Sequence, residues 1–107
     1  MFGQEIWTNR KPGGNGAVSD QPTDGEQVAT MIRKLQGSAG GWLQISGAGK
    51  FMTLTADGDD FLVVVTLTGK PPRRWGIGKV DLPRAIDAAK RFLDTGELHD
   101  KYQWAAA

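Results

Sequence analysis

The stretch Asp60–Thr68 contains the longest run of apolar side chains in the sequence. Apolar residues occupy both alternating sets of positions: Phe61, Val63, Val65 and Leu67 on one side, Leu62 and Val64 on the other. β-branched and aromatic side chains on both faces are typical of a strand in the interior of a sheet. We therefore expect Phe61–Leu67 to be the central strand of the core.

Further strands are expected on both sides of this central strand. Lys50–Ala56 precedes it across Asp57-Gly58, a strong signal for a tight hairpin turn. Trp42–Ser46 lies one turn earlier, before Gly47-Ala48-Gly49, whose glycines accept the positive φ angles of such turns. Arg73–Lys79 is expected to follow the central strand as its next neighbour.

Two stretches have the apolar spacing of amphipathic helices. In the first, Thr23 and Glu26 have the spacing of a capping box, and Gly37 suits the left-handed residue that closes a helix. In the second, Asp81 is the expected N-cap and Gly96 the closing residue. The apolar stripes are Val28, Met31, Ile32 and Leu35 in the first helix, and Leu82, Ala85, Ile86, Ala89 and Leu93 in the second. Both stripes are expected to face the core.

The order helix, strands, helix predicts an α+β fold with an antiparallel sheet of four to five strands and both helices packed on one face. Residues 23–104 are expected to form this single domain. Residues 1–22 are expected to be a partly docked segment, in which Glu5–Thr8 adds a short edge strand, followed by a flexible loop. Tyr102 and Trp104 should hold the C-terminal tail against the body, while Ala105–Ala107 should fray.

The central strand has a second apolar face that helices on one side of the sheet do not cover. If the helices cover the Phe61 side, Leu62 and Val64 need another cover: the N-terminal segment, a second copy of the chain, or a partner protein. Large exposed apolar patches are uncommon on monomers. This face points to an interaction function, with a homodimer as one form of it.

Length and composition narrow the classes of function. The 107 residues are enough for one continuous core, and the net charge of +1 gives no strong overall field for nucleic acid or membranes. The absence of cysteine excludes a disulfide framework, a thiolate metal site and a cysteine nucleophile. No apolar run approaches the roughly 20 residues that span a bilayer, and the first residues lack a signal-peptide pattern. We expect a cytoplasmic protein without membrane contact.

Candidate catalytic and metal-binding groups are few. Ser46–Phe51 resembles a phosphate-binding loop only in part, because Gln44 stands where its first glycine would be and Phe51 replaces the metal-binding hydroxyl. His99 is the single histidine, and its neighbours Glu97 and Asp100 are typical of a solvated turn. We therefore expect no cofactor, no metal and no enzymatic activity, with a homodimeric enzyme of unrecognised type as the third alternative.

Two charged clusters are candidate contact sites. The first is acidic and lies at one hairpin, where aspartates also satisfy local backbone donors: Asp57, Asp59 and Asp60. The second combines positive charge with a stacking surface, as single-strand nucleic-acid binders do: Arg73, Arg74 and Trp75, with Lys70 and Lys79 nearby. A small nucleic-acid-binding or peptide-binding regulator that uses the Arg73-Arg74-Trp75 edge is therefore the second interpretation.

The end of the sequence has a recognisable pattern. It runs through Val80-Asp81-Leu82-Pro83, Ala85, Ala89, Phe92-Leu93-Asp94-Thr95-Gly96-Glu97-Leu98 and Trp104. With the early helix and the glycine-punctuated strands, Val18 to Trp104 resembles the first-numbered immunity-protein family of bacterial polymorphic toxin systems. His99 stands where that family often has proline.

The resemblance implies a small cytoplasmic antidote that binds a toxin domain, often a nucleic-acid deaminase or nuclease, and blocks it without catalysis. A net charge of +1 argues against an acidic mimic of nucleic acid, so we expect aromatic anchors in a polar rim. The candidate contact residues are Trp42, Asp57, Asp59, Asp60, Arg73, Arg74 and Trp75.

Overall fold

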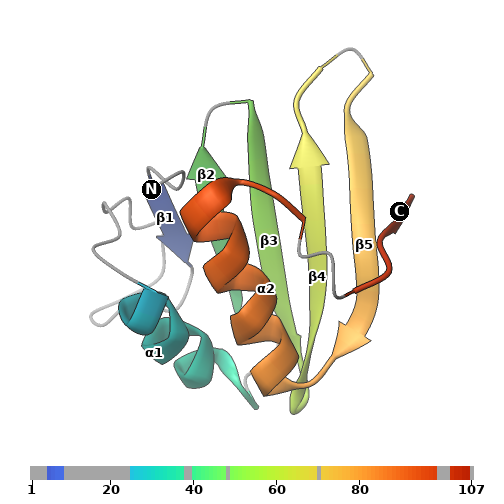
Figure 1. The fold of residues 1–107 in the computed structure, drawn as a ribbon. Helices are drawn as coiled ribbons and strands as arrows, with labels where there is room; N and C mark the ends of the chain where they lie inside the picture. Colours follow the sequence, from blue (N-terminus) through green and yellow to red (C-terminus); the bar gives the residue numbers. More distant parts are fainter. Residues whose placement is uncertain are drawn as a thin grey trace.

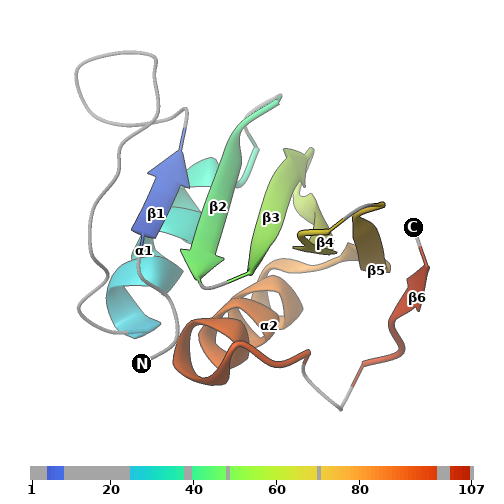
Figure 2. The ribbon, with the colours of Figure 1, turned by 90° about the horizontal axis from the view of Figure 1, so that it is seen from above.

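The computed structural model describes residues 5–8, 25–37, 40–47, 49–69, 71–98 and 102–106. These residues form one antiparallel sheet whose strands lie side by side in chain order (Figure 1). The strands are β1 (Glu5–Thr8), β2 (Trp42–Gly47), β3 (Lys50–Asp57), β4 (Asp60–Leu67), β5 (Arg73–Val80) and β6 (Ala105–Ala106). Helices α1 (Gly25–Leu35) and α2 (Leu82–Thr95) pack together on one face of the sheet (Figure 2). The predicted α+β class, with its order of helix, strands and helix, is confirmed.

Strand β4 is central, as its apolar pattern predicts. It pairs with β3 on one side and with β5 on the other, and its alternate side chains face opposite sides of the sheet. Phe61, Val63 and Val65 lie under the helices and are at most 1% exposed. Leu62, on the opposite face, is 43% exposed. The helices therefore cover one apolar face of β4 and leave the other uncovered by any described helix.

Helix α2 has a capping residue at each end, Asp81 and Gly96. The Asp81 carboxylate accepts a hydrogen bond from the Arg84 backbone N–H at 3.2 Å, which satisfies a donor in the first turn. Gly96, at φ 73°, donates its N–H to the Phe92 carbonyl at 2.8 Å and closes the helix. The predicted boundaries are confirmed, and Phe92 and Leu93 complete the buried stripe.

Helix α1 buries the predicted stripe through Val28, Ile32 and Leu35, while the capping residue Thr23 lies outside the described residues. Its C-terminal end is tied to the β3–β4 hairpin. The Gly37 N–H donates to the Gly58 carbonyl at 2.8 Å, and Gln36 Nε2 donates to the Asp59 carbonyl at 3.1 Å. This hairpin tip is therefore held from the helix side.

Strand β5 contains a bulge that sets which side chains face the helices. Val63 lies opposite Gly78 but Val64 lies opposite Gly76, so Ile77 is an extra residue on β5. Gly78 has a φ of 80°, a conformation that glycine adopts without strain. Compared with regular pairing, the extra residue moves each side chain before it in β5 to the opposite face of the sheet. Trp75 therefore lies opposite Val65, on the helix side.

The two chain ends add strands at the two edges of the sheet. Glu5–Thr8 pairs with β2 as predicted, with Ile6 2% exposed, whereas the predicted loop from residue 9 to 22 lies outside the described residues. At the other end, Tyr102 and Trp104 pack against the core as predicted. The last alanines are predicted to fray, whereas Ala105 and Ala106 form a two-residue strand that pairs with β5, because the anchored tail brings their backbone to its edge.

Candidate functional site

We call the sheet face opposite α1 and α2 the open face, because both described helices lie on the other side (Figure 2). Strand register arranges its side chains in three cross-strand rows from β2 to β5. The first row is Trp42, Thr55, Leu62 and Lys79; the second is Gln44, Thr53, Val64 and Gly76; the third is Ser46, Phe51, Thr66 and Arg74. Apolar, aromatic and hydroxyl side chains thus fill the middle, and the two cations lie at the β5 end.

The open face has the composition of a protein-binding surface. Leu62 is the exposed large hydrophobic residue among the described residues, and Trp42, Phe51 and Val64 on the same face are partly buried. Charged groups are depleted at the centre of protein interfaces and are found at their rims. Here the three rows contain no carboxylate, and the cations Arg74 and Lys79 lie at their ends.

A hollow lies next to Leu62 because β5 lacks side chains there. Gly76 lies opposite Val64 on the open face and has no side chain to cover it. The neighbouring Gly78, opposite Val63, also lines the hollow. The resulting shallow depression has a volume of about 250 Å³. Its lining is apolar: Leu62, Val63, Val64, Gly76, Gly78, Ala105 and Ala106.

The acidic hairpin forms one rim of the open face. By strand parity, Asp57 and Asp60 extend the face beyond Thr55 and Leu62. The Asp57 carboxylate lies 3.4 Å from Lys79 Nζ, and both side chains are about half exposed. A pair this exposed contributes little stability. The rim thus presents carboxylates beside a lysine on a hairpin that α1 holds in place.

The structure brings together some of the predicted contact residues and separates others. Trp42, Asp57 and Asp60 lie at one end of the open face, with Asp59 in the adjoining turn. Arg74 lies on the same face, two rows from Trp42, which is about 13 Å along the strands. Arg73 and Trp75 point to the helix side, so the Arg73-Arg74-Trp75 edge is divided between two faces. Lys70 and His99 lie outside the described residues.

Sequence reasoning did not include several members of the open face among the contact residues. The facing of Leu62 and Val64 was visible in the parity of β4, and the hairpin at Asp57-Gly58 places Phe51 on the same side. The hollow over Gly76 had no signal, because it depends on the register of β5 against β4 and on the tail that forms β6.

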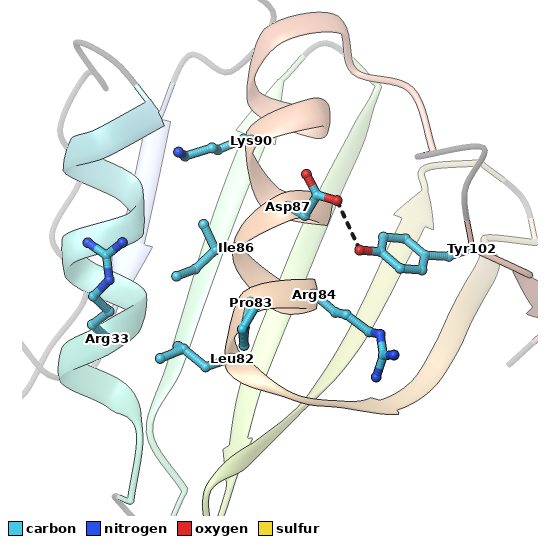
Figure 3. Close-up of a pocket in the computed structure, with 8 residues that line it drawn as sticks. All are labelled: Arg33, Leu82, Pro83, Arg84, Ile86, Asp87, Lys90 and Tyr102. Atoms are coloured by element: carbon cyan, nitrogen blue, oxygen red, sulfur yellow. Dashed lines mark hydrogen bonds between the residues drawn. The ribbon is translucent and has the colours of Figure 1, made fainter.

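A second depression lies beside α2, bounded by Arg33 of α1 and by Tyr102 of the tail (Figure 3). Its volume is about 510 Å³, and Leu82 and Ile86 point into the gap between the helices. Most of its polar groups are already engaged. Lys90 Nζ lies 2.6 Å from a Glu26 carboxylate oxygen, and Tyr102 Oη donates to Asp87 Oδ2 at 3.0 Å.

Tyr102 has a perturbed pKa in this second depression. Burial raises the pKa of its phenol above the ordinary value of 10.0, because the phenolate is poorly solvated there. The hydrogen bond to Asp87 and the negative charge of that carboxylate raise the pKa further. The hydroxyl of Tyr102 is the donor that ties the tail to α2.

No group of three or more His, Asp or Glu side chains among the described residues is placed to hold a metal ion. In the same part of the chain, neither helix is long and apolar enough to cross a membrane. Comparison of the chain with protein families, with curated proteins and with solved structures found no match.

Proposed function

We propose that this protein is a non-enzymatic, cytoplasmic antidote that binds a bacterial toxin domain on the open face of its sheet. The observation that carries the proposal is the exposure of Leu62, 43%, on a face that no described helix covers. The same face carries the aromatic side chains of Trp42 and Phe51 and, at its margins, the polar residues Asp57, Lys79 and Arg74. Aromatic and aliphatic anchors within a polar rim are the usual basis of protein capture.

The toxin-binding part of the proposal is supported by the resemblance of residues 80–104 to an immunity-protein family. The described part of this range contains α2 and the anchored tail: Asp81 caps α2, Gly96 closes it, and Phe92 lies in the core. Trp104 packs the tail against the core. The resembling residues therefore maintain the fold, and partner contact falls to the sheet face on the other side.

The second candidate, binding of single-stranded nucleic acid, has less support from the geometry. Such binders align aromatic side chains with several cations along one groove. Here Trp42 and Phe51 lie on neighbouring strands two rows apart, Lys79 is paired with Asp57, and Arg73 faces the other side.

Co-expression with the toxin tests the proposal. The test begins with the gene immediately upstream, which the proposal expects to encode a large secreted protein. The C-terminal domain of that protein is produced together with the chain, and growth and direct binding are measured. We expect the wild type to restore growth, and Leu62→Asp to weaken binding by about 30-fold, as loss of a central contact worth about 2 kcal/mol would. Thr30→Asp adds the same charge on the exposed side of α1 and should bind like the wild type.

Each result bears on a different part of the proposal. A wild-type chain that neither binds the toxin domain nor restores growth would refute the antidote. Capture that survives Leu62→Asp would move the contact off the open face. Binding of single-stranded nucleic acid that falls steeply with salt and needs Arg73 and Arg74 would favour the second candidate.

A further inference from the structure

We infer that the outer edge of β5 is a docking strand for an extended segment of the partner, one that carries acidic residues and a large apolar residue and that takes the place of β6. This inference rests on the proposed function and deepens it, because it names the kind of partner segment that the sheet receives beside the open face.

The outer edge of β5 is largely unpaired in the described part of the chain. Strand β5 has eight residues, and β4 pairs along its other side from Arg73 to Val80. On the outer side, described residues pair only with Trp75 and Gly76, through Ala106 and Ala105 respectively. An edge strand with free backbone N–H and C=O groups readily accepts a further strand, and added strands bind through main-chain hydrogen bonds.

Strand β6 is a weak occupant of this edge. It has two residues, and both alanines are exposed. The anchors of the tail, Tyr102 and Trp104, precede it and pack against the core. A longer strand can therefore replace Ala105 and Ala106 while the anchors stay in place, and it gains backbone pairs along the rest of β5.

The hollow over Gly76 defines the apolar residue that the incoming strand carries. Ala105 lies opposite Gly76 and therefore belongs to the row of Val64 on the open face. A residue that replaces Ala105 directs its side chain over the same hollow, where the lining of Leu62, Val64 and Gly78 is apolar. A leucine or phenylalanine fills this space, whereas Ala105 leaves it empty.

Charge defines the rest of the incoming segment. The sequence of β5 contains Arg73, Arg74 and Lys79 and no carboxylate. Lys79 is paired with Asp57, but among the described residues no carboxylate is within ion-pair distance of Arg73 or Arg74. Acidic residues in the part of the added strand that lies beside Arg73 and Arg74 would form ion pairs with these two side chains. A second copy of β5 that pairs antiparallel along the whole strand would instead place Arg74 opposite Lys79, which like-charge repulsion disfavours.

Peptide binding to the intact chain tests the inference directly. The probe is an eight-residue peptide of alternating valine and threonine with a central leucine and two glutamates at one end, labelled for fluorescence anisotropy. We expect it to bind, and at least tenfold weaker binding from each of three control peptides: lysine for glutamate, glycine for the leucine, and N-methylation of two alternate backbone amides.

A matched pair of chain variants tests the position of the strand. Ala105→Leu lets β6 fill the hollow itself and should weaken peptide binding at least fivefold. Ala106→Leu adds the same side chain on the opposite face of β6 and should leave peptide binding unchanged. Circular dichroism confirms that both variants fold.

The outcomes separate this inference from the proposed function. Equal binding of the lysine or N-methylated peptide, or no peptide binding by a chain that captures the toxin domain, overturns the docking strand and leaves the antidote intact. A concentration-dependent dimer that the glutamate peptide fails to dissociate identifies a second copy as the occupant and also overturns it. Peptide binding without toxin capture refutes the antidote alone.

Discussion

Tyr102 joins the C-terminal tail to α2 through the hydrogen bond from its hydroxyl to Asp87. Tyr102→Phe keeps the ring that packs against the core and removes only this bond. We expect the free energy of unfolding to fall by about 1 kcal/mol, the usual net contribution of such a bond. Urea denaturation measures the change, with Gln103→Ala, an exposed neighbour, as the control. Equal stability of Tyr102→Phe and the wild type would show that the ring alone holds the tail.

The contribution of the Tyr102 hydroxyl should also depend on pH. Because the folded state raises the pKa of this phenol above 10.0, the unfolded chain loses its proton first as the pH rises. The stabilisation is therefore complete below about pH 10 and is lost as the pH rises through the raised folded value. The stability difference between wild type and Tyr102→Phe should be constant from pH 6 to 9 and shrink above pH 10. A difference that grows in alkali would contradict the burial of the phenol.

At the scale of elements, Gly78 sets the facing of half of β5. Its φ of 80° permits the bulge, and a Cβ placed there meets nothing within 4 Å, so any cost of Gly78→Ala is conformational. We expect a loss of about 1 to 2 kcal/mol in the free energy of unfolding. Gly69→Ala is the matched control: its φ is not in the left-handed region, and its Cβ would make an ordinary contact with the Pro71 carbonyl at 3.6 Å. Equal effects of the two substitutions would argue against the bulge.

The bulge marks the boundary between the parts of the candidate site that could be predicted from sequence and those that could not. The helices, their caps and the facing of Leu62 depend on residues close together in the chain, and local spacing was enough to find them. The facing of Arg73 and Trp75 depends on one extra residue in the pairing of β5 with β4. Without that residue, Trp75 would lie on the open face opposite Thr66. Neighbouring residues of a strand point to opposite faces, so Arg74 is separated from Arg73 and Trp75 with or without the bulge. The bulge decides which of these side chains reach the open face, and no local pattern predicts it.

Strand β6 was missed for a related reason. Alanines at a chain end have no strand pattern, and local sequence predicts fraying. Their pairing with β5 follows from Tyr102 and Trp104, whose contacts with the core direct the tail along this edge. The anchors were predicted from their apolar area. The path of the tail between the anchors and the edge was not, because it depends on the shape of the finished sheet.

At the scale of the whole molecule, the sheet is covered unequally. The core lies between the sheet and the two helices, so β3 and β4 have strands on both sides and a buried face beneath α2. Strands β1 and β6 lie at the two edges and are the shortest in the sheet. This arrangement gives a stable centre and two edges of low stability. A partner can bind the open face without disturbing the core, which lies on the other side of the sheet.

Amide hydrogen exchange measures this gradient of stability. Backbone amides exchange through local opening, whose free energy is lowest at frayed edges and approaches the global value in the core. We expect the slowest exchange in β3 and β4, faster exchange in β1, and the fastest in β6 and along the outer edge of β5. Slow exchange along that outer edge in the isolated chain would show that a second copy, or residues outside the described part, already cover it.

Addition of the toxin domain should slow amide exchange at the outer edge of β5, where a docked strand supplies hydrogen-bond acceptors, and should leave exchange in β1 unchanged. Protection spread evenly over both edges would instead indicate general stabilisation and would argue against a contact on this side of the sheet.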